Sequence, residues 1–304
     1  MLDPGELFEW EPDLPDLDGV VLVEALDGFI DAGRARRIAC DHLLETLESR
    51  LLARFDIDQL LDYRGRRPSM VFVEDHWEGY EDPQLALHLV RDAAGAQFLL
   101  LAGLEPDYQW ERFVEAVRLI VTRLDVRLTI GLNAIPMGIP HTRPLGITTH
   151  ANRPELLAGA EPWVSTVQVP GSAGHLLEYR LGQRGLPTMG FAAHVPHYLA
   201  QTPFPAAAEM LLEAGAAVSG LDLPTGALGE QAAGVREAVD ERVEQSPQFA
   251  ELVRTLEEQY DQFVAGREGL LGEGTEGLPT ADELGAELER FLAQETRRGD
   301  SNDL

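Results

Sequence analysis

The run Val20–Leu26 (Val-Val-Leu-Val-Glu-Ala-Leu) constrains the fold of this chain more than any other feature of its sequence. It is short, almost entirely apolar and rich in β-branched residues, which predicts a strand buried inside a sheet. The loop Gly28–Gly33 follows, and apolar residues then recur at near-helical spacing between Ile38 and Leu47. Asp31 stands just before that helix, where an N-cap is favoured. A buried strand that leads into a helix through a short loop indicates an α/β fold.

The same two patterns recur along the chain as far as residue 217. Further strands are predicted at Leu51–Phe55, Ser69–Glu74, Leu85–Val90, Gln97–Ala102, Arg127–Gly131, Glu161–Val169 and Pro187–Ala193. Further helices are predicted at Tyr108–Leu124, Ser172–Leu181 and Ala206–Ala217. Too little helix separates the strands between residues 51 and 102 for a purely parallel sheet. We therefore expect a three-layer sandwich, in which helices cover both faces of a mixed central sheet.

Strand patterns end at Leu221–Gly226, which predicts a domain boundary. We expect an α/β domain over residues 1–220 and a helical C-terminal extension over residues 226–297. The extension is mainly acidic, and its apolar residues recur at the spacing of amphipathic helices. These residues are Phe249, Leu252, Leu256, Tyr260 and Phe263 in one segment, and Leu284, Leu288 and Phe291 in another.

The chain is strongly acidic, with 52 Asp and Glu against 24 basic residues and a formal net charge of −28. This charge repels nucleic-acid phosphates and anionic membrane surfaces, so we expect neither as a partner. The tight basic cluster of Arg64, Arg66 and Arg67 is typical of a solvated loop or of ion-pair partners.

All of the basic residues are arginines, because the sequence contains no lysine. Walker A loops, pyridoxal phosphate enzymes and protein kinases each need a lysine side chain, so these classes are excluded. The acidic N-terminal segment and the single cysteine, Cys40, are typical of the reducing cytoplasm. Cys40 and His42 do not face each other on a helix, so Cys40 is predicted to be a small core residue.

Three loops follow predicted strands: Gly28–Gly33, Asn133–Arg143 and Gly171–Gly174. In an open α/β sheet, ligands bind beyond the carboxyl ends of the strands, so these loops are candidates for lining one crevice. A further proline-rich loop follows the strand at Pro187–Ala193. The candidate binding residues in these loops are Gly28, Asp31, Gly33, Asn133, His141, Arg143, Ser172, His194 and His197.

The acidic and hydroxyl candidates each have a structural alternative. Asp31 is either a functional carboxylate or, as its position favours, the cap of the following helix. Ser172 follows Gly171 directly and so departs from the Gly-x-Ser-x-Gly pattern of a nucleophile. This favours a helix cap at Ser172, although the nearby backbone amides could also hold an anion.

The basic candidates are also open to two interpretations. Arg143 beside His141 suits a carboxylate or phosphate ligand, or an acidic partner within the chain. His194 and His197 enclose Pro196 and have no cysteine partner, which favours hydrogen-bonded loop histidines over zinc ligands. We therefore expect no catalytic residue set, no metal and no cofactor.

Four stretches together resemble a known family: Gly28–Gly33, Gly103–Pro106, Pro140–Pro144 (Pro-His-Thr-Arg-Pro) and Val195–Tyr198 (Val-Pro-His-Tyr). Their order is similar to that in the actinobacterial branch of the proteasome-assembly-chaperone 2 family, across about residues 20–217. The resemblance implies a fold similar to nucleoside phosphorylases and peptidyl-tRNA hydrolases, with a helical C-terminal extension. It also implies homo-oligomers, with a trimer favoured, and relatives that chaperone proteasome subunits. Some members carry an ATP-grasp ligase label, which the absence of lysine argues against.

Two functional hypotheses follow. The first is an oligomeric, chaperone-like protein-binding protein without catalysis, whose unknown partner the resemblance would make proteasome-related. The second is an enzyme or sensor that binds a nucleoside, phosphate or carboxylate in the crevice at the strand ends. The resemblance and the lack of a complete catalytic set favour the first.

Overall fold

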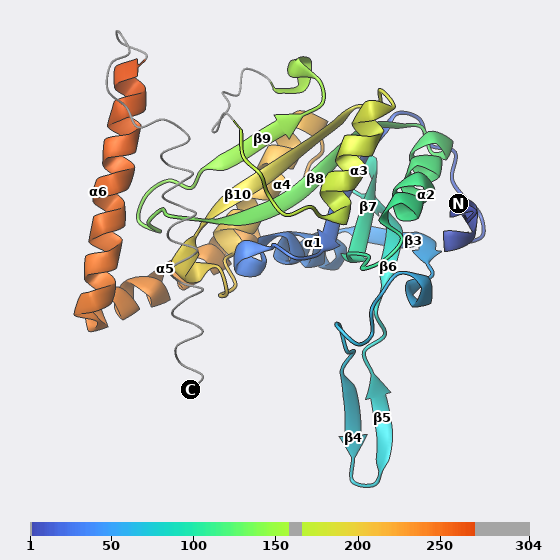
Figure 1. The fold of residues 1–304 in the computed structure, drawn as a ribbon, viewed down its shortest axis with the longest axis horizontal. Coiled ribbons are helices and arrows are strands. Elements are labelled where there is room, and N and C mark those ends of the chain that lie inside the picture. The colour runs from blue at the N-terminus through green and yellow to red at the C-terminus, as the bar shows by residue number, and fades with distance from the viewer. Residues whose placement is uncertain (1, 158–165, 271–304) are drawn as a thin grey trace.

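An eight-stranded sheet organises the molecule (Figure 1), which we describe from a computed structural model over residues 2–157 and 166–270. The strands lie in the order β1-β3-β6-β7-β2-β8-β10-β9. Their bounds are Phe8–Trp10 (β1), Val20–Asp27 (β2), Glu48–Phe55 (β3), Leu85–Arg91 (β6), Gln97–Leu104 (β7), Val126–Met137 (β8), Ile147–Ala151 (β9) and Thr188–Pro196 (β10). The four central strands β7, β2, β8 and β10 run parallel, and all other pairs are antiparallel. The predicted mixed sheet is therefore confirmed.

Six α-helices accompany this sheet within the described residues. They are Ala35–Thr46 (α1), Trp110–Arg123 (α2), Ala173–Gln183 (α3), Pro205–Ser219 (α4), Gly226–Gln245 (α5) and Pro247–Leu270 (α6). No helix in this part of the chain is long and apolar enough to cross a membrane.

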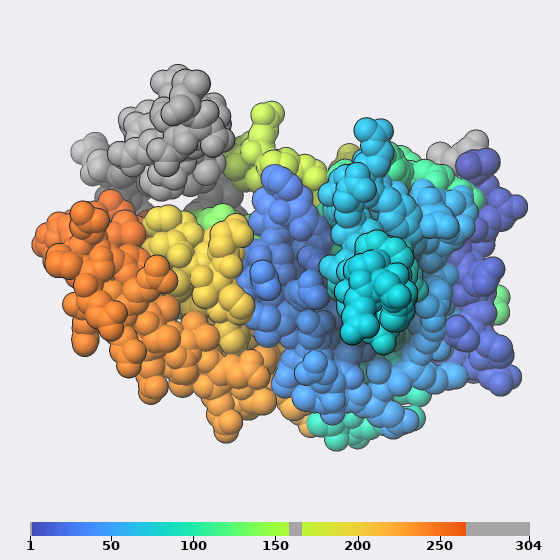
Figure 2. Space-filling model, turned by 90° about the horizontal axis from the view of Figure 1, so that it is seen from below, coloured from blue at the N-terminus to red at the C-terminus, as the bar shows by residue number. Residues whose placement is uncertain are grey.

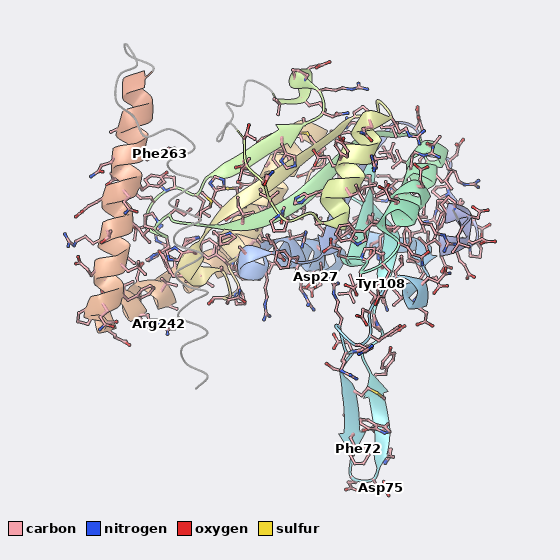
Figure 3. The ribbon with its side chains drawn as sticks, in the orientation of Figure 1. Asp27, Phe72, Asp75, Tyr108, Arg242 and Phe263 are labelled. Atoms are coloured by element: carbon pink, nitrogen blue, oxygen red, sulfur yellow. The ribbon has the colours of Figure 1, made fainter. Side chains whose placement is uncertain are left out.

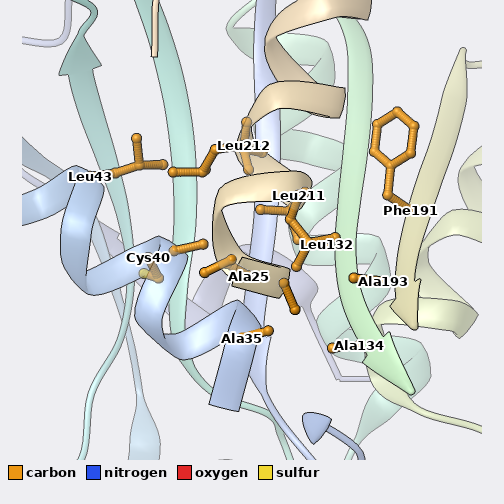
Figure 4. Close-up of a cluster of buried hydrophobic side chains, with 14 of the residues drawn as sticks. Ala25, Ala35, Cys40, Leu43, Leu132, Ala134, Phe191, Ala193, Leu211 and Leu212 are labelled. Atoms are coloured by element: carbon orange, nitrogen blue, oxygen red, sulfur yellow. The ribbon is translucent and has the colours of Figure 1, made fainter. Parts of the chain in front are cut away.

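The helices bury their apolar side chains on both faces of the sheet. On one face, α1 and α4 pack against odd-numbered residues of β2 and even-numbered residues of β8 (Figure 4). On the other face, α2 and α3 pack against a second cluster that includes Leu22, Leu26 and Phe113. These two buried clusters give the three layers that the sequence predicted. Cys40 of α1 is buried in the first cluster, as predicted for a core residue.

The C-terminal helices extend the first of these clusters. Leu228 and Val239 of α5 are buried in it, and Phe249 at the start of α6 packs against it. α6 lies at one end of the molecule, where Val253 and Leu256 are buried (Figure 1). The amphipathic pattern at 284–291 lies outside the described residues.

Two sequence predictions differ from the structure near β8. The predicted loop from Asn133 begins later, because β8 continues to Met137. Beyond Gly131 this strand pairs only with β10. The strand can therefore contain Pro136, which has no N–H to donate, because no described strand is paired on its β2 side there. The strand predicted at Glu161–Val169 is absent over residues 166–169, and its first part lies outside the described residues. β9, which the sequence did not predict, pairs with β10 instead.

A two-stranded hairpin stands away from the main sheet. Its strands, Met70–Val73 (β4) and His76–Tyr80 (β5), pair only with each other. We refer to residues 70–80 as the arm. Figure 1 shows the arm projecting from the sheet, and Figure 2, which looks along it, shows its cyan atoms standing in front of the blue N-terminal elements.

Candidate functional site

The parallel strands β7, β2, β8 and β10 end at one edge of the sheet, which we call the carboxyl edge. From β2 the chain passes through α1 to β3, on the β7 side of the sheet. From β8 it passes through α3 to β10, on the opposite side. β2 and β8 are neighbours, and the connections that follow them run to opposite sides of the sheet. A crevice is left between the two loops at such a point, and α/β proteins bind ligands there.

Glu24 is a carboxyl group within β2, and its side chain faces α3. It is 5% exposed, and its Oε1 accepts a hydrogen bond from Leu26 N at 2.9 Å. Burial raises the pKa of Glu24 to about 7, an effect that the positive charge of Arg36 only partly offsets. Glu24 is therefore poised to gain or lose a proton near neutral pH.

Glycines make the space that this carboxyl group occupies. Gly131 of β8 lies opposite Glu24 in the sheet, and Gly174 lies above it in α3. A Cβ on Gly174 would lie 2.9 Å from Glu24 Oε2, closer than real Cβ contacts allow. Gly190 of β10 leaves similar room, since a Cβ there would lie 2.5 Å from His150 Nε2.

Two histidines and their partners continue the polar cluster. His150 Nε2 lies 2.9 Å from Glu178 Oε2. Burial opposes protonation of His150, but the hydrogen bond and charge of Glu178 outweigh it and raise the pKa of His150. His175 Nε2 lies 3.3 Å from Asn133 Nδ2, and burial lowers the pKa of His175. Near neutral pH, His175 is therefore the neutral member of the two.

Arg36 reaches this cluster from the first turn of α1. The side chain is 7% exposed, and its Nη2 donates to Ile30 O at 3.3 Å. Its buried Nε has no hydrogen-bond partner among the described residues. A buried guanidinium N–H is costly to leave unpaired, so its position marks where a polar partner belongs.

These groups surround a small cavity between the sheet and α3. Its polar lining comes from Glu24, Arg36, Asn133, His150, Ser172, His175 and Glu178. The cavity is partly open to solvent and has a volume of about 20 Å³, which is close to the room that a single water molecule needs. It therefore admits one small polar group rather than a whole nucleoside.

The structure brings some of the predicted residues to this cavity. Asn133 and Ser172 line it, and the Ser172 hydroxyl caps α3 by accepting from His175 N at 3.1 Å. Gly28 is not among the lining residues and lies against Glu105, which accepts hydrogen bonds from Phe29 N and Ala173 N. Asp31 accepts from Arg36 N at 2.9 Å and Arg37 N at 3.1 Å, so it caps the first turn of α1. The helix-cap interpretation of Asp31 and Ser172 is the one that the contacts support.

His141 and Arg143 lie instead where the loop after β8 meets the C-terminal helices. His141 Nε2 lies 3.0 Å from Asp240 Oδ1 of α5, and its Nδ1 lies 2.7 Å from the Tyr198 hydroxyl. Arg143 donates to both carboxylate oxygens of Asp261 at 2.8 Å and to Glu257 at 3.1 Å. We call these contacts the loop–helix junction. Arg143 thus has acidic partners within the chain.

The remaining candidates support the backbone around β10. Gly33 has a φ of +66°, and its N–H donates to Ala200 O at 2.7 Å. A Cβ on Gly33 would lie 2.6 Å from Phe204 Cβ, so glycine permits this close approach. His194 Nε2 lies 2.8 Å from Thr148 Oγ1, and burial lowers the pKa of His194 to about 4. The His197 ring contacts the Tyr198 ring edge-on at 5.4 Å.

The sequence matches the PAC2 family over residues 25–243, more than half of the chain. The chain belongs to the PAC2 family. Gly33, His141 and Tyr198 belong to the motifs that carried the resemblance, and in this chain they make contacts next to β10 and at the loop–helix junction.

Several solved structures are similar to this PAC2 protein. A Mycobacterium tuberculosis protein of unknown function, Rv2714, is 51% identical, with a TM-score of 0.83 over 86% of this chain and 93% of that chain. A Corynebacterium glutamicum protein of unknown function is 38% identical, with a TM-score of 0.82 over 85% and 98%. The M. tuberculosis proteasome-assembly chaperone homologue Rv2125 is 25% identical, with a TM-score of 0.70 over 77% and 100%. A comparison with curated proteins found no match.

The charged centre of the cavity in this PAC2 chain was not predicted from its sequence. Glu24 is the one charged residue inside the apolar run Val20–Leu26, and a charge in a buried strand is the signal that could have found it. Arg36, His150 and Glu178 come from three other elements and gave no local signal. Within residues 2–157 and 166–270, no group of three or more His, Cys, Asp and Glu side chains is arranged to hold a metal ion.

Proposed function

We propose that this PAC2 protein is a chaperone-like, protein-binding protein that works in the cytoplasm as a homo-oligomer, with a trimer favoured, rather than as an enzyme. The observation that carries the proposal is the arm. Large apolar side chains cover it, although it packs against neither of the two core clusters. Exposed apolar patches of this kind mark surfaces that bind other proteins.

The surface of the arm suits contact with another chain. Phe72 is 55% exposed and Trp77 is 62% exposed, and their rings contact each other edge-on at 5.0 Å. Met70, Val71 and Tyr80 are also exposed. An isolated two-stranded hairpin is marginally stable in water at best, and its outer edges carry unpaired backbone groups. Contact with a partner would bury the rings and pair those edges.

The position of the arm agrees with a docking role. β3 runs parallel to β7, because both are antiparallel to β6, so the insertion after Phe55 leaves the sheet at its carboxyl edge. Figure 3 shows Asp27 and Tyr108 at this edge, with Phe72 and Asp75 along the arm. Arg66 fixes the base of the arm by donating to Glu105 O at 2.9 Å and pairing with Asp107 at 3.2 Å. A fixed base presents the apolar strands at a defined place.

The relatives support a protein partner over a small substrate. Rv2125 is described as a proteasome-assembly chaperone homologue, and a proteasome-related partner is the specific form of our proposal. The second hypothesis was an enzyme or sensor that binds a nucleoside, phosphate or carboxylate, and its nucleoside form has less support because the cavity has a volume of only about 20 Å³.

A double substitution on the arm tests the proposal. Phe72→Ser with Trp77→Ser removes the exposed rings and leaves both core clusters intact. We expect this variant to have a smaller mass in solution than the wild type, and to lose the proteins that the wild type captures from a native lysate. Light scattering after size exclusion and quantitative mass spectrometry of the captured proteins give the two readouts.

Phe29→Ser is the matched control, because Phe29 is an exposed aromatic residue at the same edge but outside the arm. It should leave both mass and captured proteins unchanged. If the arm variant keeps the mass and the captured proteins of the wild type, the arm is not the docking element and the proposal fails.

A further inference from the structure

The cavity at the carboxyl edge is lined by the buried positive charge of Arg36, whose hydrogen-bonding capacity is only partly satisfied. Arg36 lines this space, and its buried Nε–H has no hydrogen-bond partner among the described residues. Arg36 Nη2 donates to Ile30 O, which holds one side of the guanidinium in place. A negatively charged group in the cavity would therefore meet a preorganised positive charge.

Other donors converge on the same space. The Ser172 oxygen accepts from His175 N, which leaves its own O–H free to donate into the cavity. Glu24 adds a further donor whenever its carboxyl group is protonated. Three donors from three separate elements thus surround a volume that fits one small polar group.

The charges of the lining limit the ligand to a single negative charge. Arg36 supplies one fixed positive charge, and His150 and Glu178 form a pair of opposite charges when His150 is protonated. A phosphate dianion would place two charges and four oxygens beside Glu24 and Glu178, where repulsion and size both oppose it. A carboxylate carries one charge on two oxygens and matches a guanidinium donor well.

We propose that this cavity binds the carboxylate group of a small monocarboxylic acid, held between the Arg36 guanidinium, the Ser172 hydroxyl and the carboxyl group of Glu24. The rest of the ligand points through the open side of the cavity. Two carboxyl groups in contact are stable when they share one proton, because two adjacent negative charges repel each other. Binding therefore requires that Glu24 be protonated. This site goes beyond the docking role proposed for the arm and does not depend on it.

The proton on Glu24 makes binding depend on pH. The charged groups that face Glu24 are Arg36 from α1, Glu105 after β7 and Glu178 from α3. His150 of β9 and His175 of α3 complete the titratable lining. Burial sets the pKa of Glu24 near 7, so affinity for a carboxylate should fall as the pH rises through this value.

Thermal unfolding with sodium formate and sodium acetate tests the site, with sodium chloride used to hold the ionic strength constant. The dissociation constant follows from the rise in Tm with ligand concentration. At pH 6 and pH 8, one unit on each side of the Glu24 pKa of about 7, we expect roughly tenfold weaker binding at the higher pH. Chloride and inorganic phosphate should give no comparable rise in Tm.

Two substitutions in the cavity separate carboxylate binding from a nonspecific salt effect. Glu24→Gln keeps a permanent amide donor, so it should bind formate at pH 8 as well as at pH 6. A gain of binding at pH 8 cannot result from misfolding, so this variant decides the question by itself. Arg36→Met should lose binding at both pH values, with its Tm in the absence of ligand reporting that it is folded.

The controls lie outside the cavity. Glu209→Gln changes a different carboxyl group whose pKa burial raises, in α4, and should behave as the wild type. The Phe72→Ser, Trp77→Ser variant should also keep the formate response, so the two proposals can fail separately. Equal effects of formate and chloride would overturn the proposal and leave the cavity as a site for a water molecule. A pH dependence that persists in Glu24→Gln would overturn the role of Glu24.

Discussion

Glu24 combines two properties that rarely occur together in a buried strand. Its carboxyl group is almost completely buried, in room that Gly131 and Gly174 leave for it, yet it lines a cavity that is partly open to solvent. Arg36 reduces the cost of its negative charge without forming a direct ion pair among the described contacts. A carboxyl group in this setting changes its protonation state when its surroundings change, which suits a binding residue better than a structural one.

The titration of Glu24 has a consequence for stability. The ordinary pKa of a glutamate is 4.5, and burial raises that of Glu24 to about 7. Between these values the unfolded chain binds fewer protons than the folded protein, so the free energy of unfolding falls as the pH rises. Above pH 7 the loss is complete, and the free energy of unfolding is lower by roughly 3 kcal/mol than it would be with an unshifted pKa.

Glu24→Gln should remove this loss of stability. We expect the free energy of unfolding of the variant, relative to the wild type, to increase by up to roughly 3 kcal/mol as the pH rises through the same window. Urea unfolding at a series of pH values, without added carboxylate, measures it. Glu209→Gln should show a smaller change, because Glu209 is less buried. Parallel pH profiles for Glu24→Gln and the wild type would contradict the assigned pKa.

At the scale of residues, the sequence predicted part of the cavity. Asn133 and Ser172 were found because each follows a predicted strand, and they do line it. His141 and Arg143 gave an equally strong signal but pair with α5 and α6. Local sequence shows where a polar residue follows an apolar run, but not which distant element it meets. Arg36 reaches the cavity from a helix start that gave no such signal.

At the scale of elements, α6 is joined to the sheet domain through few contacts. Besides its packing on α5, it is held by Glu257 and Asp261, which bind Arg143, and by Tyr260, whose hydroxyl donates to Pro144 O at 3.0 Å. The Phe249 ring contacts Tyr198 edge-on at 5.2 Å. The loop–helix junction therefore sets the position of the acidic C-terminal helix.

Arg143→Ala should loosen α6 more than it lowers global stability. Exposed ion pairs contribute about 0–1 kcal/mol each, so we expect a small change in the free energy of unfolding. The substitution removes the Arg143 contacts of Asp261 and Glu257, however, and among the described residues leaves only the Thr142 hydroxyl bound to Glu257. Amide hydrogen exchange over residues 247–265 should therefore become faster.

Arg254→Ala is the matched control for that experiment. Arg254 also binds two carboxylates, Glu251 and Glu258, but both lie within α6 itself. It should therefore change exchange in α6 less than Arg143→Ala does. Equal exchange rates in the two variants would show that the junction does not hold the helix.

The elements that the sequence predicted best have strong internal patterns. β2, β6, β7, α2 and α4 lie close to their predicted ranges, because buried strands and amphipathic helices show their period locally. β9 was missed, because each of its five residues is only half-buried and its pattern does not alternate. β8 was predicted too short, with its end at Gly131, whereas it continues through Pro136 to Met137 where it pairs with β10 alone.

At the scale of the whole molecule, the chain combines a sheet domain that carries the cavity with an arm that stands apart from it. The arm contributes no residue to either core cluster. At its base, Glu81 N donates to Ser69 O at 2.9 Å, so the hairpin can be shortened at that pair without disturbing the strands below. This separation allows docking and folding to be tested independently.

Replacing residues 70–80 with Asn-Gly should leave folding of the sheet domain intact. Asn-Gly favours the tight turn that joins two antiparallel strands. At low protein concentration we expect the free energy of unfolding to match the wild type within about 1 kcal/mol, because no core contact is lost. At high concentration the wild type should gain stability by association, since binding partners that recognise only the folded state raise Tm by mass action. The shortened variant should not, so its Tm should be independent of concentration. A Tm that rises equally with concentration in both proteins would place the contact between copies elsewhere on the sheet domain.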